Sequence, residues 1–272
     1  MKNGFLIIIG VSLLISCNKR TKELEMDNSS NIVFSDSLGH KISKRELINS
    51  NGTFNYAIYG IEDVPDAAKQ LHNKAIEFGQ NGNYEKSIEV LLEANKLAPK
   101  WPYPLYDLAY TYLLQDDFEN ALKYYRLTDS LAPKGFFTSK TALYTLENEK
   151  KGVFKKGLYK MYLSLEWIDN PTEKLEMTKK LVSSFPSFAP GLKDYASLLE
   201  GVERENVIKK GLELDSDIET EGMLQINNAL ILENKGEINK AKDILTSIIF
   251  DTRSTYGNIE MAKFVLNNLT NK

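Results

Sequence analysis

The chain has 272 residues, of which 42% are hydrophobic and 26% are charged, and its formal net charge is −3. This composition is typical of a folded protein with a hydrophobic core, and it excludes a chain that is disordered throughout. The sequence holds no run of basic residues long enough to follow a phosphate backbone, so nucleic acid is not expected as a ligand.

The N-terminus has the features of an export signal. Lys2 supplies a positive charge, residues 5–15 are almost wholly apolar, and Ser16 directly precedes the only cysteine, Cys17. An apolar run of about a dozen residues is shorter than the roughly 20 that a membrane-spanning helix needs. Residues 1–16 resemble the signal peptide of a bacterial lipoprotein. The resemblance implies cleavage after Ser16 and acylation of Cys17, so that a lipid anchor joins the protein to a membrane.

The residues around the cysteine also indicate which membrane the lipoprotein is expected to reach. Asn18 stands where an aspartate would indicate retention in the inner membrane, so we expect the outer membrane. Lys19, Arg20 and Lys22 are basic, whereas an acidic cluster accompanies surface export in some Gram-negative groups, and a periplasm-facing position is therefore favoured over a surface-exposed one. Once Cys17 is acylated, no thiol remains for catalysis, metal binding or a disulfide.

Residues 17–64 are mostly polar and predict a tether with little regular structure. Two short apolar segments within it, 32–34 and 56–59, are candidate strands, either paired with each other or packed on the first helices.

From Pro65 onward the sequence has a helical period and an internal repeat. Pro99 and Pro133 lie 34 residues apart, and each closes a stretch with matching residues upstream. The small residues Ala75, Ser87 and Ala94 superpose on Ala109, Ala121 and Thr128, and the bulky residues Phe78, Tyr84 and Leu91 superpose on Tyr112, Phe118 and Tyr125. Two antiparallel helices interlock only where small side chains lie at the crossing positions, so this spacing predicts stacked helical hairpins.

This pattern resembles the tetratricopeptide repeat. The resemblance implies an all-α solenoid of tetratricopeptide-type helical hairpins over residues 65–268, with about five repeats, a degenerate middle and a short tail at 269–272. The first four helices are expected at 66–80, 84–97, 103–114 and 118–131, with Asn83 and Asp117 as N-caps.

The later helices are less regular. A third pair begins at Phe136 and contains a long loop at 149–157. Asn170 and Pro171 then predict the start of a helix that runs to residue 184. Further helices are expected at 188–200 and 203–214, then a repeat marked by Ala229 and Ala241 with Gly236 in its turn, and a closing helix at 256–268.

Nothing in the sequence predicts an enzyme, and we expect no catalytic residue, cofactor or metal site. His40 and His72 lack a partner group three or four residues away, so each is interpreted as solvated or structural. The acidic pairs at 116–117 and at 215 and 217 fall at predicted helix junctions, where turn and cap roles account for them. No glycine-rich loop follows an apolar strand.

The first helix of each hairpin is expected to line a concave groove that binds a protein or peptide. Its candidate residues are Asn73, Ile76, Tyr103, Tyr106, Tyr110, Leu113, Lys140, Tyr144 and Asn148. Alternatively, the tyrosines contact the tether or an adjoining helix. Tetratricopeptide domains that clamp C-terminal carboxylates of chaperones carry a lysine and an asparagine where this chain has His72 and Ile76, so that class of ligand is not expected.

The sequence therefore favours a non-catalytic, lipid-anchored scaffold at the bacterial envelope. A narrower hypothesis is an accessory subunit of an outer-membrane assembly or secretion machine, since lipoproteins of similar size with such repeats serve there. A hypothesis of another class is a glycan-binding uptake lipoprotein, but it has only Trp101 and Trp167 for stacking on sugars, and both are interpreted as structural.

Overall fold

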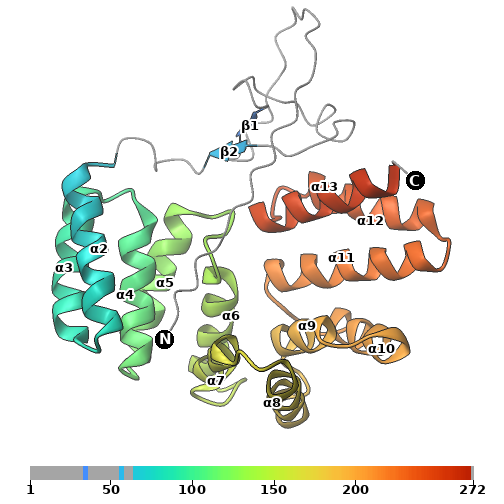
Figure 1. The fold of residues 1–272 in the computed structure, drawn as a ribbon, viewed down its shortest axis with the longest axis horizontal. Helices are drawn as coiled ribbons and strands as arrows, with labels where there is room; N and C mark the ends of the chain where they lie inside the picture. The colour runs from blue at the N-terminus through green and yellow to red at the C-terminus, as the bar shows by residue number, and fades with distance from the viewer. Residues whose placement is uncertain (1–32, 36–54, 58–63, 271–272) are drawn as a thin grey trace, which may run out of the picture.

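A computed structural model describes residues 33–35, 55–57 and 64–270, and within this part of the chain the fold is a stack of helices (Figure 1). The helices are α2 (Asp66–Gln80), α3 (Tyr84–Leu97), α4 (Pro102–Leu114), α5 (Phe118–Leu131), α6 (Ser139–Lys150), α7 (Leu158–Ser164), the 3-10 turn η1 (Leu165–Trp167), α8 (Pro171–Ser184), α9 (Ala189–Ser197), α10 (Gly201–Leu212), α11 (Ile218–Asn234), α12 (Ile238–Phe250) and α13 (Tyr256–Thr270). Strands β1 (Val33–Ser35) and β2 (Asn55–Ala57) pair antiparallel, with Val33 opposite Ala57, which confirms that the two candidate segments pair. The signal peptide, Cys17 and His40 lie outside the described residues.

The first two hairpins follow the small-residue spacing of the sequence. All six small residues at the crossing positions are buried, from Ala75 in α2 to Thr128 in α5. The Ser87 hydroxyl donates to the Ala75 carbonyl over 2.8 Å, so α3 crosses α2 at van der Waals distance and satisfies its own polar group there. The predicted all-α solenoid is confirmed in this region.

Helix starts agree with most of the predicted caps. The Asp117 carboxylate accepts from the Asn120 N–H over 3.1 Å at the start of α5. Asn170 accepts from the N–H groups of Thr172 and Glu173 at the start of α8. Asn83 occupies the N-cap position of α3, as predicted, although its side chain makes no capping hydrogen bond.

The degenerate middle has a structural explanation. After α6 the chain forms the short helix α7 and the turn η1 in place of a long second helix. The buried carboxylate of Glu149 accepts from the N–H of Gly157 over 2.8 Å and from that of Tyr159 over 2.7 Å, which fixes the loop on the start of α7. The shorter helix turns the stack at this point.

As a result, the stack curls back on itself, and α11 lies against α6 (Figure 1). The Asp217 carboxylate caps α11 by accepting from the Thr220 N–H over 3.0 Å, and it also accepts from the Thr141 hydroxyl of α6 over 3.2 Å. Beyond α12, the Tyr256 N–H donates to the Lys134 carbonyl over 2.9 Å, so the start of the closing helix touches the loop between α5 and α6. Helices that lie far apart in the sequence, such as α6 and α11, are therefore in contact.

Close approach between α11 and α13 depends on a glycine. A Cβ atom placed on Gly222 would lie 2.1 Å from the Asn258 amide nitrogen. That amide donates to the carbonyls of Ile218 and Glu219, each over 3.1 Å, and Asn258 is buried. Any side chain at residue 222 must therefore displace a buried, fully used amide.

We predict that Gly222→Ala lowers the free energy of unfolding by about 1–3 kcal/mol, because Asn258 would lose buried hydrogen bonds on moving aside. Denaturant unfolding followed by circular dichroism measures this. Gly257→Ala is the matched control, since Gly257 lies in α13 with no neighbouring atom within 4 Å. The control should be neutral or more stable by up to about 1 kcal/mol; equal losses in both variants would contradict the packing argument.

Candidate functional site

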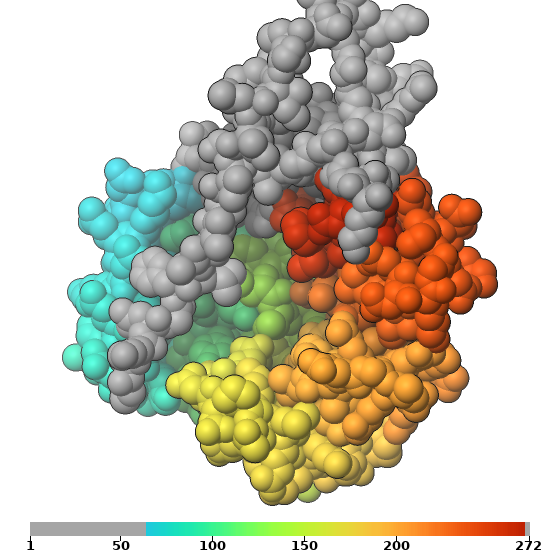
Figure 2. All heavy atoms as spheres, turned by 45° about the vertical axis from the view of Figure 1, so that its right-hand side comes forward, coloured from blue at the N-terminus to red at the C-terminus, as the bar shows by residue number. Residues whose placement is uncertain are grey.

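An aromatic face on α4 forms the centre of the candidate site. Tyr103, Tyr106 and Tyr110 recur at intervals of three and four residues, which places them on one side of the helix. The opposite side is anchored by buried residues such as Leu105 and Leu108. Figure 2 shows a hollow in one face of the molecule, with green segments at its floor, cyan segments on its left and yellow to red segments below it and on its right.

Phe137 extends this aromatic face from the loop between α5 and α6. Its ring lies 5.2 Å from that of Tyr106 and 5.6 Å from that of Tyr103, measured between centroids. The side chain is nevertheless 51% exposed, and the backbone has a φ of 48°. A bulky residue rarely adopts this left-handed conformation, which costs of order 1 kcal/mol or more. The fold thus holds an exposed ring in a strained position beside the tyrosines.

Trp167 lies at the other end of the aromatic face, and here the sequence interpretation was wrong. Trp101 is buried against His72, with ring centroids 4.9 Å apart, as expected for a structural residue. Trp167 is instead 57% exposed, although Leu165, two residues earlier in η1, is buried. Burial raises the pKa of the Tyr110 phenol, and the side chain of Trp167 acts against this shift. The aromatic face is hereafter the set Tyr103, Tyr106, Tyr110, Phe137 and Trp167.

A carboxylate lies among these rings. Burial raises the pKa of Tyr106 and of Tyr110 to about 12 in each case, and the charge of Glu166 adds to both shifts. Partial burial also raises the pKa of Glu166 itself, with Asp194 of α9 adding to it and Lys193 and Lys174 opposing it. Glu166 thus has one like charge and two opposite charges near it on the side of η1.

Three of the predicted groove residues, all on α6, are used within the protein. The Tyr144 hydroxyl donates to the Asp215 carbonyl over 2.8 Å, because the curl of the stack brings the loop before α11 onto α6. The Lys140 ammonium pairs with Asp129 at 2.6 Å. Asn148 donates to the Tyr144 carbonyl within its own helix over 2.9 Å.

Among the remaining residues predicted to line the groove, the prediction for Leu113 was wrong. It is fully buried in the hydrophobic core, because it lies on the inner side of α4, and it cannot contact a partner. Asn73 and Ile76 of α2 are exposed, as a groove residue requires. Of the tyrosines, Tyr106 also contacts a neighbouring segment, since its hydroxyl bonds that of Thr138 over 2.8 Å, which matches the alternative raised from the sequence.

His72 has a structural role. Its Nε2 lies 2.6 Å from a carboxylate oxygen of Asp107, and its ring packs on Trp101 and Tyr103.

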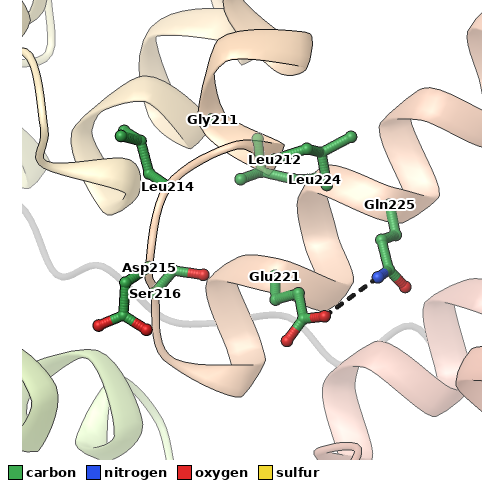
Figure 3. A pocket seen from close by; sticks show the side chains of 8 residues that line it. All are labelled: Gly211, Leu212, Leu214, Asp215, Ser216, Glu221, Leu224 and Gln225. Atoms are coloured by element: carbon green, nitrogen blue, oxygen red, sulfur yellow. Dashed lines mark hydrogen bonds between the residues drawn. The ribbon is translucent and has the colours of Figure 1, made fainter.

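Two hollows also lie along α11. One of about 240 Å³ is lined by Leu214, Asp215, Glu221, Gln225 and four neighbours, and Figure 3 shows the Gln225 amide donating to Glu221 at its edge. The other, of about 210 Å³, borders α12 and shares Glu221 and Gln225.

The described residues contain no cluster of three or more histidine, cysteine or acidic residues able to hold a metal ion. Within the same ranges, none of the helices combines the length and apolar character that crossing a bilayer requires.

Comparison with known proteins identifies the first two hairpins. A model of the tetratricopeptide repeat matches residues 68–100 and 103–134, which correspond to α2–α3 and α4–α5. These two hairpins are similar to tetratricopeptide repeats. This fold typically serves as a non-catalytic scaffold for protein interaction, which is the general class that the sequence indicated. None of the curated proteins matches the chain.

Solved structures with helical repeats show a distant likeness. MamA (41-end) from Desulfovibrio magneticus RS-1 is 16% identical over 68% of this chain and 94% of its own, with a TM-score of 0.32. TTC0263, a thermophilic tetratricopeptide protein of Thermus thermophilus, is 16% identical over 74% of this chain and 100% of its own, with a TM-score of 0.31. At such scores, the geometry of the aromatic face is taken from this structure alone.

A titrating carboxylate lies beside the α6–α11 contact. Burial raises the pKa of Glu219 to about 7, the neighbouring Asp217 raises it further, and Lys193 and Lys140 oppose the shift. A carboxyl whose pKa is higher in the folded state contributes stability that is complete below its unfolded pKa and is lost as the pH rises through the folded value.

We therefore predict that the melting temperature of the protein falls between pH 5 and pH 8. The fall should be smaller in the Glu219→Gln variant, because its side chain at this position cannot ionise. Thermal unfolding of both proteins across this pH range measures the difference. Parallel pH profiles for the two proteins would show that Glu219 does not titrate in this range.

Proposed function

We propose that this protein is a lipid-anchored scaffold at the envelope of a Gram-negative bacterium, and that it binds another protein through its aromatic face. The observation that carries the proposal is the exposure of Phe137 and Trp167 beside the tyrosines of α4. Exposed aromatic rings on a rigid support are typical of binding sites, since they bury large areas at small entropic cost.

The support beneath the aromatic face favours binding without large rearrangement. Tyr103 packs edge-on against Phe136 at 4.7 Å, and Tyr106 packs against the fully buried Tyr125 at 5.8 Å. These contacts fix the rings before any partner arrives, so little conformational freedom is lost on docking. The α5–α6 loop adds the ring of Phe137 to the same face.

The anchor is proposed from the sequence around Cys17. A multiply acylated terminus holds to a bilayer more firmly than a single chain would, and the residues up to 64 would separate the lipid from the first helix. We place the protein at the outer membrane, facing the periplasm. Such tethering raises the local concentration of the scaffold around membrane-bound partners. A narrower form of this proposal is that the protein is an accessory subunit of an outer-membrane assembly or secretion machine.

Glycan binding is the second candidate, and one observation now favours it. The exposed indole of Trp167 next to Tyr110 could stack on a sugar ring, contrary to the structural role expected for it. Protein binding accounts for more of this surface. Phe137 and Ile76 are exposed apolar side chains, and they offer no polar group that could bind the hydroxyls of a sugar.

Site-specific photo-crosslinking tests the main proposal. We predict that a benzoylphenylalanine at residue 137 gives a discrete protein adduct in cells that make the full-length chain, because the ring would lie in the interface. The matched control carries the same group at Val202, an exposed apolar residue of α10. Absence of an adduct at residue 137, or the same adducts at both positions, contradicts the proposal.

A separate experiment tests the anchor. We predict that Cys17→Ala abolishes incorporation of a labelled fatty acid and releases the protein from the membrane fraction, since no other cysteine can be acylated. Fractionation and lipid labelling of both proteins measure this. Unchanged labelling of the variant would rule out Cys17 as the acylated residue.

A further inference from the structure

We propose that Thr138 and Tyr159 are positioning residues of the aromatic face, and that their hydroxyl groups hold the exposed ring of Phe137 in the orientation that a partner meets. This inference rests on the proposed function and adds to it the part of the core that prepares the site. Tyr159 is fully buried, so it acts on the site through Thr138 and not by touching the partner.

The first argument is that the backbone of Phe137 needs support from its surroundings. Its φ of 48° is unfavourable for a bulky residue, and the half-exposed ring gains little stabilisation from burial. Neither local preference nor burial of the ring therefore explains this conformation. Such a conformation persists only where neighbouring contacts fix it.

The second argument is that Thr138, the next residue in the chain, supplies these contacts. Its hydroxyl oxygen lies 2.8 Å from the hydroxyl of Tyr106 on α4 and 3.1 Å from that of Tyr159 on α7. One side chain thus joins the α5–α6 loop to two other helices. The Tyr106 ring in turn lies 5.2 Å from the Phe137 ring, measured between centroids. A series of contacts therefore runs from the buried Tyr159 to the exposed ring.

The third argument is that the Thr138 hydroxyl is not used for a local bond. Thr138 occupies the N-cap position of α6, where a threonine hydroxyl commonly accepts from an N–H of the first turn. Its side chain makes no such bond. The hydroxyl of Ser139, the next residue, instead accepts from the Phe136 N–H over 3.2 Å. Both side chains thus fix the chain on either side of Phe137, at the expense of a cap for their own helix.

The start of the same loop is held separately by α13. The Lys134 carbonyl accepts from the Tyr256 N–H over 2.9 Å. A Cβ atom placed on Gly135 would lie 3.1 Å from the Thr255 side chain, so the loop backbone packs closely there. Phe137 lies between this fixed end and the threonine that follows it. Loss of the threonine hydroxyl should therefore release the ring while the rest of the loop stays in place.

Fluorine NMR of the full-length protein with 4-fluorophenylalanine at residue 137 tests whether these residues hold the ring. Thr138→Val keeps the shape of the side chain but removes the hydroxyl, and it should move the resonance toward its position in the unfolded protein. Tyr159→Phe should move it in the same direction. Thr138→Ser keeps the hydroxyl and should restore the original resonance.

The matched control is Thr145→Val, which removes a buried hydroxyl of the same helix that donates only to the Thr141 carbonyl, over 2.7 Å. It should leave the resonance unchanged. Circular dichroism checks that every variant is folded. Because Tyr159 acts through Thr138, adding Tyr159→Phe to Thr138→Val should move the resonance little further, which a double-mutant cycle measures.

Photo-crosslinking with benzoylphenylalanine at residue 137 connects this positioning to binding. The yield of the partner adduct should fall several-fold in Thr138→Val and in Tyr159→Phe, because a released ring loses conformational freedom on docking. Thr138→Ser and Thr145→Val should keep the yield of the parent protein.

An unchanged resonance in Thr138→Val, or the same change in Thr145→Val, overturns the positioning role. So does a full adduct yield in Thr138→Val and Tyr159→Phe. The parent protein decides the proposed function separately. If it gives no adduct at residue 137, the scaffold proposal is rejected, whereas the fluorine resonance still decides whether Thr138 and Tyr159 hold the ring.

Discussion

Close packing between antiparallel helices requires a small side chain at each crossing, and the whole structure depends on this constraint. In the first hairpins the positions are filled by residues such as Ala75 and Ser87, and in the last by Ala229 and Ala241, all of them buried. Between α11 and α13 even an alanine is too large, and Gly222 lets Asn258 bond the opposing backbone. These contacts hold each helix at a fixed distance from the next, so the stack acts as a rigid support.

The curvature of the stack decides which surface is left for a partner. Because α7 is short and Glu149 fixes the loop before it, the chain turns and brings α11 onto α6. The same region ends in η1, where the charge of Glu166 acts on Tyr106 and Tyr110 of α4. A regular solenoid would present the first helix of every hairpin to a ligand, whereas here Tyr144 contacts the loop before α11 and the exposed Trp167 belongs to the candidate site. The irregular middle therefore positions the candidate site.

The aromatic face combines features that stability alone does not require. Phe137 is strained and exposed, and Trp167 is exposed although Leu165, two residues earlier, is buried. Strain and exposed rings in one place are the usual marks of a surface shaped for binding.

The sequence by itself determined the helices, their pairing and the burial of the small residues, because a helical hairpin is encoded by spacings within about 34 residues. It also predicted the caps at Asp117 and Asn170 from local chemistry. Only the tertiary structure decided which groove residues face a partner. Leu113 turned inward, and α11 met α6 through Asp217 and Thr141, which lie 76 positions apart. No local spacing encodes such a contact, since it follows from small rotations summed over every hairpin between them.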